Sequence, residues 1–360
     1  MKIGINARTF DVTEPSGAIQ SSIRLTQMLH ERVDETVLFG SDNLTNHYPN
    51  MDVESTFYPS SSQMYGVLWE RTILPLKAQQ QNIDILYAPN GNGPLHRTPF
   101  PTVMCIHDVN AQKGMSSGIH QLYRRTAVPF GANSADIITT VSEFSKQEIH
   151  EILGIPKSKI KVVYNGIDPF FRAEGNTQAL SLPDKFILFV GALNPRKNIE
   201  RAIKAFKAAK NRGNLEHKMV IIGPKNKSIF KNLSVEETDD IIIPGFVSKG
   251  ELKFAYTAAD LFLYPSLYEG FGLPPLEALA CGTPVVASSS SALPEVLCDA
   301  AELPDPYATN EICKSMLRIL ENPEYGTELV QRGKARVAKF TWENALSSLL
   351  DVFREVRRSR

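Results

Sequence analysis

The sequence predicts an α/β protein built from two doubly wound domains that face each other across a cleft. Its 360 residues exceed the roughly 100–200 residues of one domain, so two domains are expected. Short, apolar, β-branched runs alternate with longer amphipathic stretches, which is the pattern of β–α–β units around parallel sheets. Residues Phe171–Pro183 break this pattern with a polar linker that contains Gly and Pro. We therefore expect a first domain over residues 1–172 and a second over residues 173–340.

The first domain contains several runs that are typical of buried parallel strands. Each run is short, nearly continuously apolar, and ends near Gly, Pro, Asn or Asp, as strands covered on both faces do. Between them lie stretches with the apolar spacing of helices. The expected strands are KIGIN, TVLFG, DILYAP, TVMCIHD, DIITTV and IKVVYNG, and the expected helices are Gly17–Glu31, Gly118–Asn133 and Glu143–Leu153.

The second domain repeats this alternation, and one more helix follows it. About residues 341–360 have helical apolar spacing with Thr341 as N-cap, and we expect this helix to pack back on the first domain. Ligands bind such sheets at the carboxyl ends of their strands, so the cleft is the expected site. The expected strands are FILFVGAL, KMVIIG, DIIIPG, DLFLYPS and PVVAS, and the expected helices are Ile199–Asn211, Lys249–Ala258 and Asn310–Leu320.

Composition argues against several classes of protein. Lys+Arg 39 balance Asp+Glu 39, so we expect no nucleic-acid partner. The four cysteines form no CxxC motif and are typical of core residues in a reducing compartment. The start has no signal-peptide h-region, and no apolar run reaches the roughly 18–20 residues that span a bilayer. We therefore expect a cytoplasmic protein. The basic end REVRRSR could contact the inner face of a membrane, although a solvated tail is the favoured interpretation.

One stretch, YPSLYEGFGLPPLEALACGTPVVAS, carries Glu269 and Glu277 with no basic residue nearby in the sequence. The strand DLFLYPS ends there, and the loop after it leads into a short helix that begins at two prolines and stops at Gly282. The start of a helix offers free backbone N–H groups and the positive end of its dipole. The stretch therefore predicts an anion site, and the natural anion is phosphate.

Two acids beside a phosphate site indicate a ligand that also carries hydroxyl groups. Carboxylates do not bind phosphate, but they accept hydrogen bonds from sugar hydroxyls. A nucleoside diphosphate sugar, with its ribose, diphosphate and hexose, fits this arrangement. The alternative interpretation is that Glu277 only favours the helix N-terminus and that Glu269 is solvated.

At these residues the chain resembles the GT-B retaining glycosyltransferases of family 4, the glycosyl transferases group 1. The spacing Glu269-x7-Glu277 within GFGLPPLEALACGTPVVAS resembles the donor-binding motif of that family. The resemblance extends through VGALNPRKNIERAIKAF, TVSEFSK, VYNGID and FTWENA, and so covers nearly the whole chain. The NPRKN form is most similar to the mannosyltransferase-like branch of polysaccharide-assembly enzymes.

The resemblance implies a role for each matching residue on the donor side. Glu277 would hold the ribose hydroxyls, and Glu269 would bond hydroxyls of the transferred sugar. Arg196 and Lys197 would stabilise the charge of the leaving diphosphate. Many family members carry another Arg where this chain has Ala192, so these two cations must carry that role. The other expected donor contacts are the backbone N–H groups of Phe271, Gly272 and Leu273 to the diphosphate, and the side chains of Phe246 and Val247 to the base.

The first domain offers two further expected contacts. Gly17 opens the helix after the first strand, where family members often have two glycines that let the backbone approach the ligands; here the pair is Ser16 and Gly17. His107 ends the strand TVMCIHD, and the resemblance implies that it contacts the ligand near the transferred sugar. Asp108 could orient the ring. A purely structural histidine is the alternative.

The resemblance implies a retaining glycosyltransferase that moves a hexose, with mannose from GDP-mannose as the best candidate. The acceptor would be a glycan or a lipid-linked saccharide. No protein nucleophile is assigned, and the departing phosphate would take the proton of the acceptor. No DxD motif is present, so neither a cofactor nor a metal is expected. UDP-glucose and other hexose donors stay open, as do a nucleotide-sugar epimerase or hydrolase on the same fold and a non-catalytic nucleotide-sugar-binding subunit.

Overall fold

The chain divides into two compact units. Unit 1 comprises Met1–Gly166 and Trp342–Arg360, and unit 2 comprises Ile167–Thr341. The division therefore lies after Gly166, earlier than the expected boundary at residue 172. The computed structural model describes residues 1–12, 15–56, 63–114, 119–175, 177–192, 194–223 and 237–359, with the backbone alone at 63–64, 67, 119–124 and 126. Gly118, Asn176 and Leu193, which the sequence analysis places in a helix, a linker and a strand, lie outside the described residues.

In the described residues, unit 1 contains one sheet of seven parallel strands. The strand order is β3-β2-β1-β4-β5-β6-β7. Because β1 lies inside the sheet, the chain winds first to one side of it and then to the other. The strands are β1 (Lys2–Asn6), β2 (Glu35–Gly40), β3 (Asp52–Ser55), β4 (Ile85–Ala88), β5 (Thr102–Cys105), β6 (Ile137–Thr140) and β7 (Ile160–Val162).

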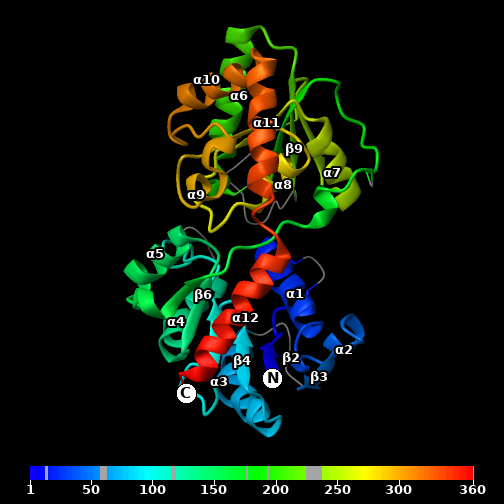
Figure 1. The fold of residues 1–360 in the computed structure, drawn as a ribbon. Coiled ribbons are helices and arrows are strands. Elements are labelled where there is room, and N and C mark those ends of the chain that lie inside the picture. The colour runs from blue at the N-terminus through cyan, green and yellow to red at the C-terminus, as the bar shows by residue number, and fades with distance from the viewer. Residues whose placement is uncertain are drawn as a thin grey trace. The chain divides into compact units, whose positions relative to one another are not determined.

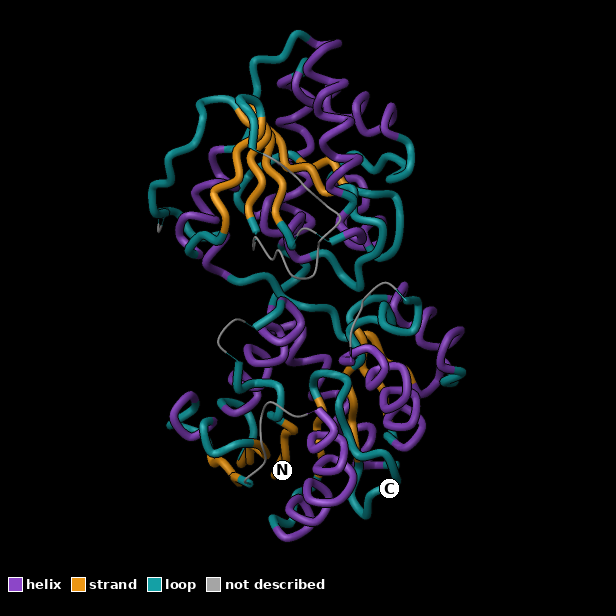
Figure 2. Tube along the Cα trace, turned by 180° about the vertical axis from the view of Figure 1, so that it is seen from behind, coloured by secondary structure: helices purple, strands orange, loops and turns teal. Residues whose placement is uncertain are grey.

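Helices cover both faces of this sheet (Figure 2). On one face, Ile5 of β1 shares a core with Leu29 of α1 and Phe353 of α12. On the other face, Trp69 of α3 and Val128 of α4 are buried against the strands. The helices of unit 1 are α1 (Gly17–His30), α2 (Leu44–His47), α3 (Gln63–Gln80), α4 (Ile119–Ser134), α5 (Glu143–Leu153), the 3-10 helix η1 (Lys157–Lys159) and α12 (Trp342–Arg358).

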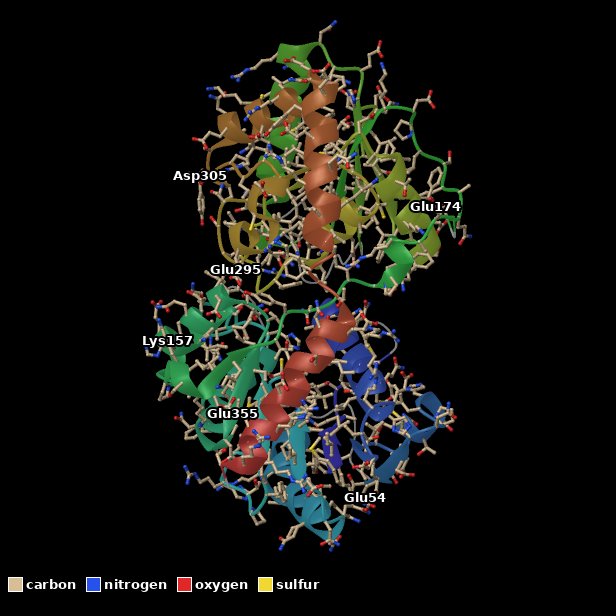
Figure 3. The ribbon with its side chains drawn as sticks, in the orientation of Figure 1. Glu54, Lys157, Glu174, Glu295, Asp305 and Glu355 are labelled. Atoms are coloured by element: carbon tan, nitrogen blue, oxygen red, sulfur yellow. The ribbon has the colours of Figure 1, made fainter. Side chains whose placement is uncertain are left out.

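The last helix, α12, packs on the sheet of unit 1 (Figure 1, red). Its apolar side chains lie in the core described above. Glu355, which lies on α12 (Figure 3), pairs with Lys161 of β7 at 2.7 Å. Arg357 lies 3.6 Å from the carboxylate of Asp84. Arg357, one arginine of the basic end, is therefore engaged with an acid of its own unit.

Unit 2 contains a parallel sheet of five strands in the described residues, in the order β10-β9-β8-β11-β12. On one face, Phe189 of β8 packs with Phe206 of α6 and Met316 of α10. On the other, the ring of Tyr256 in α7 lies 5.4 Å from that of Phe262 in β11. The strands are β8 (Phe186–Val190), β9 (Lys218–Ile222), β10 (Ile241–Gly245), β11 (Leu261–Tyr264) and β12 (Val285–Ala287). The helices are η2 (Pro169–Phe171), η3 (Pro195–Lys197), α6 (Ile199–Gly213), α7 (Lys249–Ala258), α8 (Leu273–Ala280), α9 (Leu293–Leu297), η4 (Cys298–Ala300), α10 (Thr309–Leu320) and α11 (Pro323–Val337).

The stretch that was expected to be a linker is bonded to unit 2. The guanidinium of Arg172 donates to the carbonyls of Val337 and Phe340 at 2.5 and 2.9 Å. The ammonium of Lys253 donates to the carbonyls of Ala173 and Gly175 at 2.5 and 2.7 Å. Polar composition alone does not separate a free linker from a loop whose carbonyls are held by one buried lysine, Lys253.

Several short or weakly patterned elements were not expected from the sequence. They include the edge strand β3, the long helix α3, and helices α2, α9 and α11. Helix α3 contains Pro75, which argues against a helix in sequence reasoning. None of the helices in the described part of the chain combines the length and apolar character that crossing a membrane requires.

Candidate active site

The strand order of unit 2 places the carboxyl ends of β8 and β11 beside each other. Strand β8 pairs with β9 on one side and with β11 on the other. The strands that follow β8 in the chain are therefore added first on one side of it and then on the other, and the order switches between β8 and β11. Ligands of doubly wound sheets bind at this point. The loop after β8 carries Arg196 and Lys197, and the loop after β11 carries Glu269.

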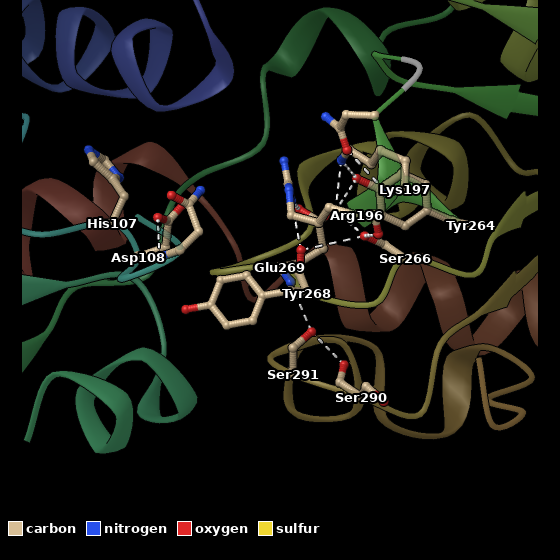
Figure 4. Close-up of polar contacts among 12 residues, drawn as sticks. His107, Asp108, Arg196, Lys197, Tyr264, Ser266, Tyr268, Glu269, Ser290 and Ser291 are labelled. Atoms are coloured by element: carbon tan, nitrogen blue, oxygen red, sulfur yellow. Dashed lines mark hydrogen bonds and ion pairs between the residues drawn. The ribbon is translucent and has the colours of Figure 1, made fainter. Parts of the chain in front are cut away.

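Glu269 lies at the centre of a buried cluster formed by these two loops (Figure 4). Its Oε1 accepts hydrogen bonds from Lys197 Nζ at 2.7 Å, Tyr264 Oη at 3.0 Å and Ser266 Oγ at 2.6 Å. Its Oε2 lies 2.9 Å from Arg196 Nη1. Lys197 also donates to the hydroxyl of Tyr264. The interpretation of Glu269 as a solvated acid is therefore wrong, since this side chain is buried and paired.

Burial and charge act in opposite directions on Glu269. Burial alone would raise the pKa of its carboxyl, but Lys197 and Arg196 outweigh burial and lower the pKa to about 2. Burial and the Glu269 charge raise the pKa of Tyr264 well above its usual value. The cluster therefore holds two cations against one carboxylate and keeps a net positive charge. The sequence hid this pairing because the cations lie on a different strand end.

The turn of Arg196 and Lys197 is fixed to the loop after β11. The carbonyl of Arg196 accepts from the backbone N–H of Leu267 at 2.8 Å and from Ser266 Oγ at 3.2 Å. Arg196 Nη1 also donates to the carbonyl of Tyr268 at 2.7 Å. Both cations are thus held from several sides, which pre-organises their positive charge.

The loop between Glu269 and α8 approaches its neighbours closely. Gly272 has φ 109°, and a Cβ there would lie 2.6 Å from Leu293 Cδ2, so glycine is required on both counts. Helix α8 begins at Leu273 and continues through Pro274 and Pro275. Proline has no backbone N–H, so this helix start offers fewer donors to an anion than the sequence analysis assumed. Of the expected amides here, those of Gly272 and Leu273 adjoin the helix start, and Phe271 is a buried residue.

Glu277 lies on α8 in a different electrostatic state. Burial raises its pKa to about 7, against the hydrogen bond that Tyr256 donates at 3.1 Å; the charge of Asp168 also raises it, and that of Lys249 lowers it. The two acids of the stretch therefore differ, because two cations outweigh burial at Glu269, whereas burial outweighs the opposing contacts at Glu277. The carboxyl of Glu277 therefore changes its charge close to neutral pH, whereas that of Glu269 stays ionised.

Phe246 and Val247 follow β10 at the same edge of the unit 2 sheet. Phe246 is 74% exposed, which is unusual for so large an apolar ring. Val247 is half-buried. A flat exposed ring at the sheet edge that also carries the Glu269 cluster is suited to packing against a planar ligand.

In unit 1, His107 lies just beyond β5 and is held through one ring nitrogen. Its Nε2 lies 3.1 Å from the carbonyl of Pro89, 3.2 Å from Ser22 Oγ and 3.8 Å from Cys105 Sγ. Its Nδ1 is buried and has no hydrogen-bond partner among the described residues. Because a carbonyl accepts only, Nε2 carries the proton and Nδ1 is left to a ligand or water.

Two contacts around His107 differ from those expected. The carboxylate of Asp108, which was expected to orient the ring, accepts the backbone N–H of Asn110 at 3.2 Å. The ring is contacted instead by Pro89 and by Ser22 of α1, which was not predicted. Burial lowers the pKa of His107, but Cys105 and then Asp108 outweigh it and raise the pKa above its ordinary value. The ring also lines an open pocket of unit 1.

Gly17 is the first residue of α1 and is exposed. The N-cap, Ser16, makes no side-chain cap bond. Ser22, about one turn further along α1, contacts His107. Helix α1 therefore lies at the carboxyl-end edge of the unit 1 sheet both at its first residue and at Ser22. Over the described ranges, no group of three or more His, Cys, Asp or Glu side chains could hold a metal ion.

Comparison with known proteins follows this division of the chain. The family model described as "Glycosyltransferase Family 4" matches residues 15–170, and the one described as "Glycosyl transferases group 1" matches residues 172–336. The two matches cover almost the whole chain, one in the first half and one in the second.

Two relatives come from Escherichia coli. "O-antigen chain mannosyltransferase B" is 29% identical over 243 residues, which is 64% of this chain and 64% of the relative. "Serotype-specific mannosyltransferase WbdA" is 28% identical over 285 residues, 74% of this chain and 35% of the relative. The chain thus spans just under two thirds of the length of one and about a third of the other.

The fold has solved counterparts. Anabaena Alr3699/HepE in complex with UDP-glucose aligns with a TM-score of 0.73 and 18% identity, over 99% of this chain and 100% of that one. WaaG, a glycosyltransferase involved in lipopolysaccharide biosynthesis, aligns with a TM-score of 0.69 and 12% identity, over 98% of this chain and 99% of that one. These likenesses show the fold. Together with the two family matches, they show that the chain belongs to family 4 of the GT-B glycosyltransferases, a family of transferase enzymes. The two E. coli relatives are mannosyltransferases by name.

Proposed function

We propose that the protein transfers a hexose, with mannose from GDP-mannose as the favoured donor, to a glycan or lipid-linked saccharide in polysaccharide assembly. The observation that carries this proposal is the cluster of Arg196, Lys197 and Glu269 between the carboxyl ends of β8 and β11. It is buried, keeps a net positive charge and lies where doubly wound sheets bind their ligands. A diphosphate leaving group is the anion that this charge suits best.

The choice of mannose rests on the relatives. Two E. coli proteins and one from Salmonella typhimurium that align with this chain are named mannosyltransferases, and two of these names refer to the O-antigen chain. We propose the same donor sugar and the same class of acceptor here. A lipid-linked acceptor would bring a cytoplasmic enzyme to the inner face of a membrane.

In the proposed reaction, the protein supplies electrostatics and position. Arg196 and Lys197 stabilise the charge that grows on the diphosphate as the glycosidic bond breaks. The acceptor hydroxyl attacks from the same face with retention, and its proton passes to the departing phosphate. Oε1 of Glu269 already accepts three hydrogen bonds, which makes it a poor nucleophile. Its role is to hold the cations and to accept from a sugar hydroxyl through Oε2.

The remaining predicted residues take complementary roles in this proposal. Glu277 binds the ribose hydroxyls, and the ring of Phe246 packs on the base with Val247 beside it. The amides of Phe271, Gly272 and Leu273 meet the diphosphate. In unit 1, Gly17 lets the backbone approach a ligand, and His107 Nδ1 bonds a hydroxyl of a saccharide. No metal or other cofactor is proposed.

A hydrolase or epimerase on this fold needs a carboxyl or imidazole that can give up a proton at the sugar. Glu269, with a pKa of about 2, cannot serve as that acid near neutral pH. This argument excludes Glu269 as the acid of a hydrolase or an epimerase, whereas Glu277 and His107 have raised pKa values. The paired cations favour an enzyme over a non-catalytic binding subunit.

The test is a donor panel on the purified protein. GDP-mannose, UDP-glucose, UDP-N-acetylglucosamine and dTDP-rhamnose are each incubated with and without mannose oligosaccharides, and released nucleoside diphosphate is measured. We expect release from GDP-mannose that increases with the acceptor and is lost in Glu269→Ala. Glu216→Ala is the matched control, because Glu216 also pairs with a lysine of unit 2 but is exposed. Release that the acceptor does not change would favour a hydrolase, and no binding of any nucleotide would overturn the proposal.

A further inference from the structure

Asn198 follows Lys197 directly and has an uncommon backbone conformation. Its φ is 59° and its ψ is 34°, in the left-handed region that Asn tolerates better than most residues. There the chain leaves the turn η3 and enters α6. A left-handed residue at this junction lets Lys197 end one helix while the next begins without an intervening loop.

The side chain of Asn198 is buried and fully used. Its Nδ2 donates to the carbonyl of Pro265 at 3.0 Å and to that of Pro306 at 2.8 Å. Its Oδ1 accepts from Arg201 Nη1 at 2.8 Å. Both amide hydrogens and the amide oxygen therefore have partners, which is what a buried side-chain amide requires.

These bonds join the two sides of the switch point in unit 2. Asn198 belongs to the loop after β8, whereas Pro265 is the first residue after β11. The next residue, Ser266, donates to Glu269, and Leu267 donates to the carbonyl of Arg196. Asn198 is thus one of a small set of contacts that fix the cation turn relative to the carboxylate loop.

We infer that Asn198 is a positioning residue, which holds Arg196 and Lys197 where they bind the diphosphate of the donor. This inference rests on the proposed function and extends it to a residue that touches neither the donor nor the reacting atoms. A cation displaced by about an ångström loses much of its effect on a charged transition state. The affinity for the diphosphate therefore depends in part on the side-chain amide of Asn198, which holds the cations in place.

Two variants separate backbone conformation from side-chain bonding. Asn198→Gly keeps the left-handed backbone at low cost but removes all three side-chain bonds. Asn198→Asp keeps the shape and the acceptor for Arg201 but faces two carbonyls with a carboxylate. The matched control is Asn214→Gly, because Asn214 is also left-handed, with φ 48°, and lies exposed at the other end of α6.

The first measurement is amide hydrogen exchange of Leu267 by mass spectrometry, which needs no ligand. We expect Asn198→Gly to accelerate this exchange roughly tenfold or more, since the loops separate more often. The second is binding of GDP and GMP by calorimetry. We expect GDP affinity to fall roughly tenfold in Asn198→Gly and further in Asn198→Asp, with GMP affinity little changed. Asn214→Gly should change neither.

Unchanged exchange, or faster exchange with GDP affinity equal to wild type, would overturn the inference. In the second case Asn198 would stabilise the loops without positioning the cations for a ligand. If the wild-type protein binds neither GDP nor UDP, the proposed function fails and the ligand role of Asn198 fails with it. Normal GDP binding in both Asn198 variants contradicts the inference alone.

Discussion

The two units share a strand order but differ in the chemistry of their switch points. Around β1 and around β8 the order of the first five strands is the same. In unit 2, that edge carries Arg196, Lys197 and Glu269, all charged and mutually paired. In unit 1, Nε2 of His107 contacts a carbonyl, a hydroxyl and a thiol. From the shared topology we expect each unit to bind a ligand at the same edge of its sheet, and from the residues after each strand we expect the chemistry of the two edges to differ.

The comparison predicts that charge matters more than neutral contacts for turnover. Lys197→Met keeps the methylenes that lie 3.5–3.7 Å from a Cβ position at Gly191 and removes the ammonium. We expect the rate of transfer to fall by about 10²–10³, as for other preorganised charge contacts to a transition state. Steady-state kinetics with the active donor measure this.

Lys185→Met is the control for Lys197→Met. Lys185 also pairs with a glutamate of unit 2, at 2.7 Å, but both side chains are exposed. Its activity should equal that of the wild type. Equal losses in the two variants would show that the Lys197 effect is not specific to the buried cluster.

A substitution at the neutral sheet edge of unit 1, at His107, should lower the activity less than Lys197→Met does. His107→Ala removes one hydrogen-bonding ring nitrogen toward a ligand, so we expect kcat/KM to fall by roughly tenfold. The control is His150→Ala, because the side chain of His150 makes a local bond, to the carbonyl of Ile155 at 2.9 Å. A loss in His107→Ala larger than that in Lys197→Met would reverse the ranking of the two edges.

The close packing of the carboxylate loop predicts a difference between two glycines of unit 2. Gly272→Ala combines a φ of 109° with a Cβ contact at 2.6 Å, so we expect the free energy of unfolding to fall by about 2–3 kcal/mol. Gly282→Ala has a φ of 85° and, among the described residues, no heavy atom within 4 Å of the new Cβ. It should cost about 1 kcal/mol. Urea unfolding measures both, and equal costs would contradict the close approach to Leu293.

The two acids of unit 2 predict opposite dependences of stability on pH. The folded pKa of Glu277, about 7, lies above the ordinary 4.5, so its contribution is full below 4.5 and is lost as pH rises to 7. The folded pKa of Glu269 is about 2, below the ordinary 4.5. Its contribution to stability is therefore present above pH 4.5 and is lost as pH falls toward 2. Glu277→Gln should therefore unfold at a higher temperature than wild type at pH 8, and this advantage should shrink toward pH 4.5. Thermal unfolding from pH 4.5 to 8 tests this, and a constant difference would contradict the raised pKa.

Much of the fold was predictable because buried parallel strands are continuous apolar runs. The strands from β4 to β12 lie within the runs that the sequence marked, and the inner strands β4, β5, β6, β8, β9 and β11 are buried along nearly their whole length. The edge strand β3, whose DVES contains a single apolar residue, lacks this signal. Helix α3 was hidden by Pro75 and by an apolar pattern spread around the helix.

The candidate site was predictable by position but not by pairing. Arg196 and Lys197 were expected at a strand end and lie there, yet nothing in the sequence shows that Glu269 lies within 2.9 Å of both. The contacts of Asn198 and Ser22 were equally hidden, because each reaches carbonyls or a ring that lie 67 or more residues away. A sequence motif marks residues along one strand end, and contacts between strand ends require the fold.

The most direct test of the central claim is the difference between GDP and GMP affinity in the wild-type protein and in Lys197→Met. The claim is that Arg196 and Lys197 of unit 2 bind the diphosphate of the donor. It predicts that the wild type binds GDP more tightly than GMP by at least roughly tenfold, and that this preference largely disappears in Lys197→Met while GMP affinity is kept. An equal preference for GDP in both proteins would contradict the claim, because the terminal phosphate would then be bound elsewhere.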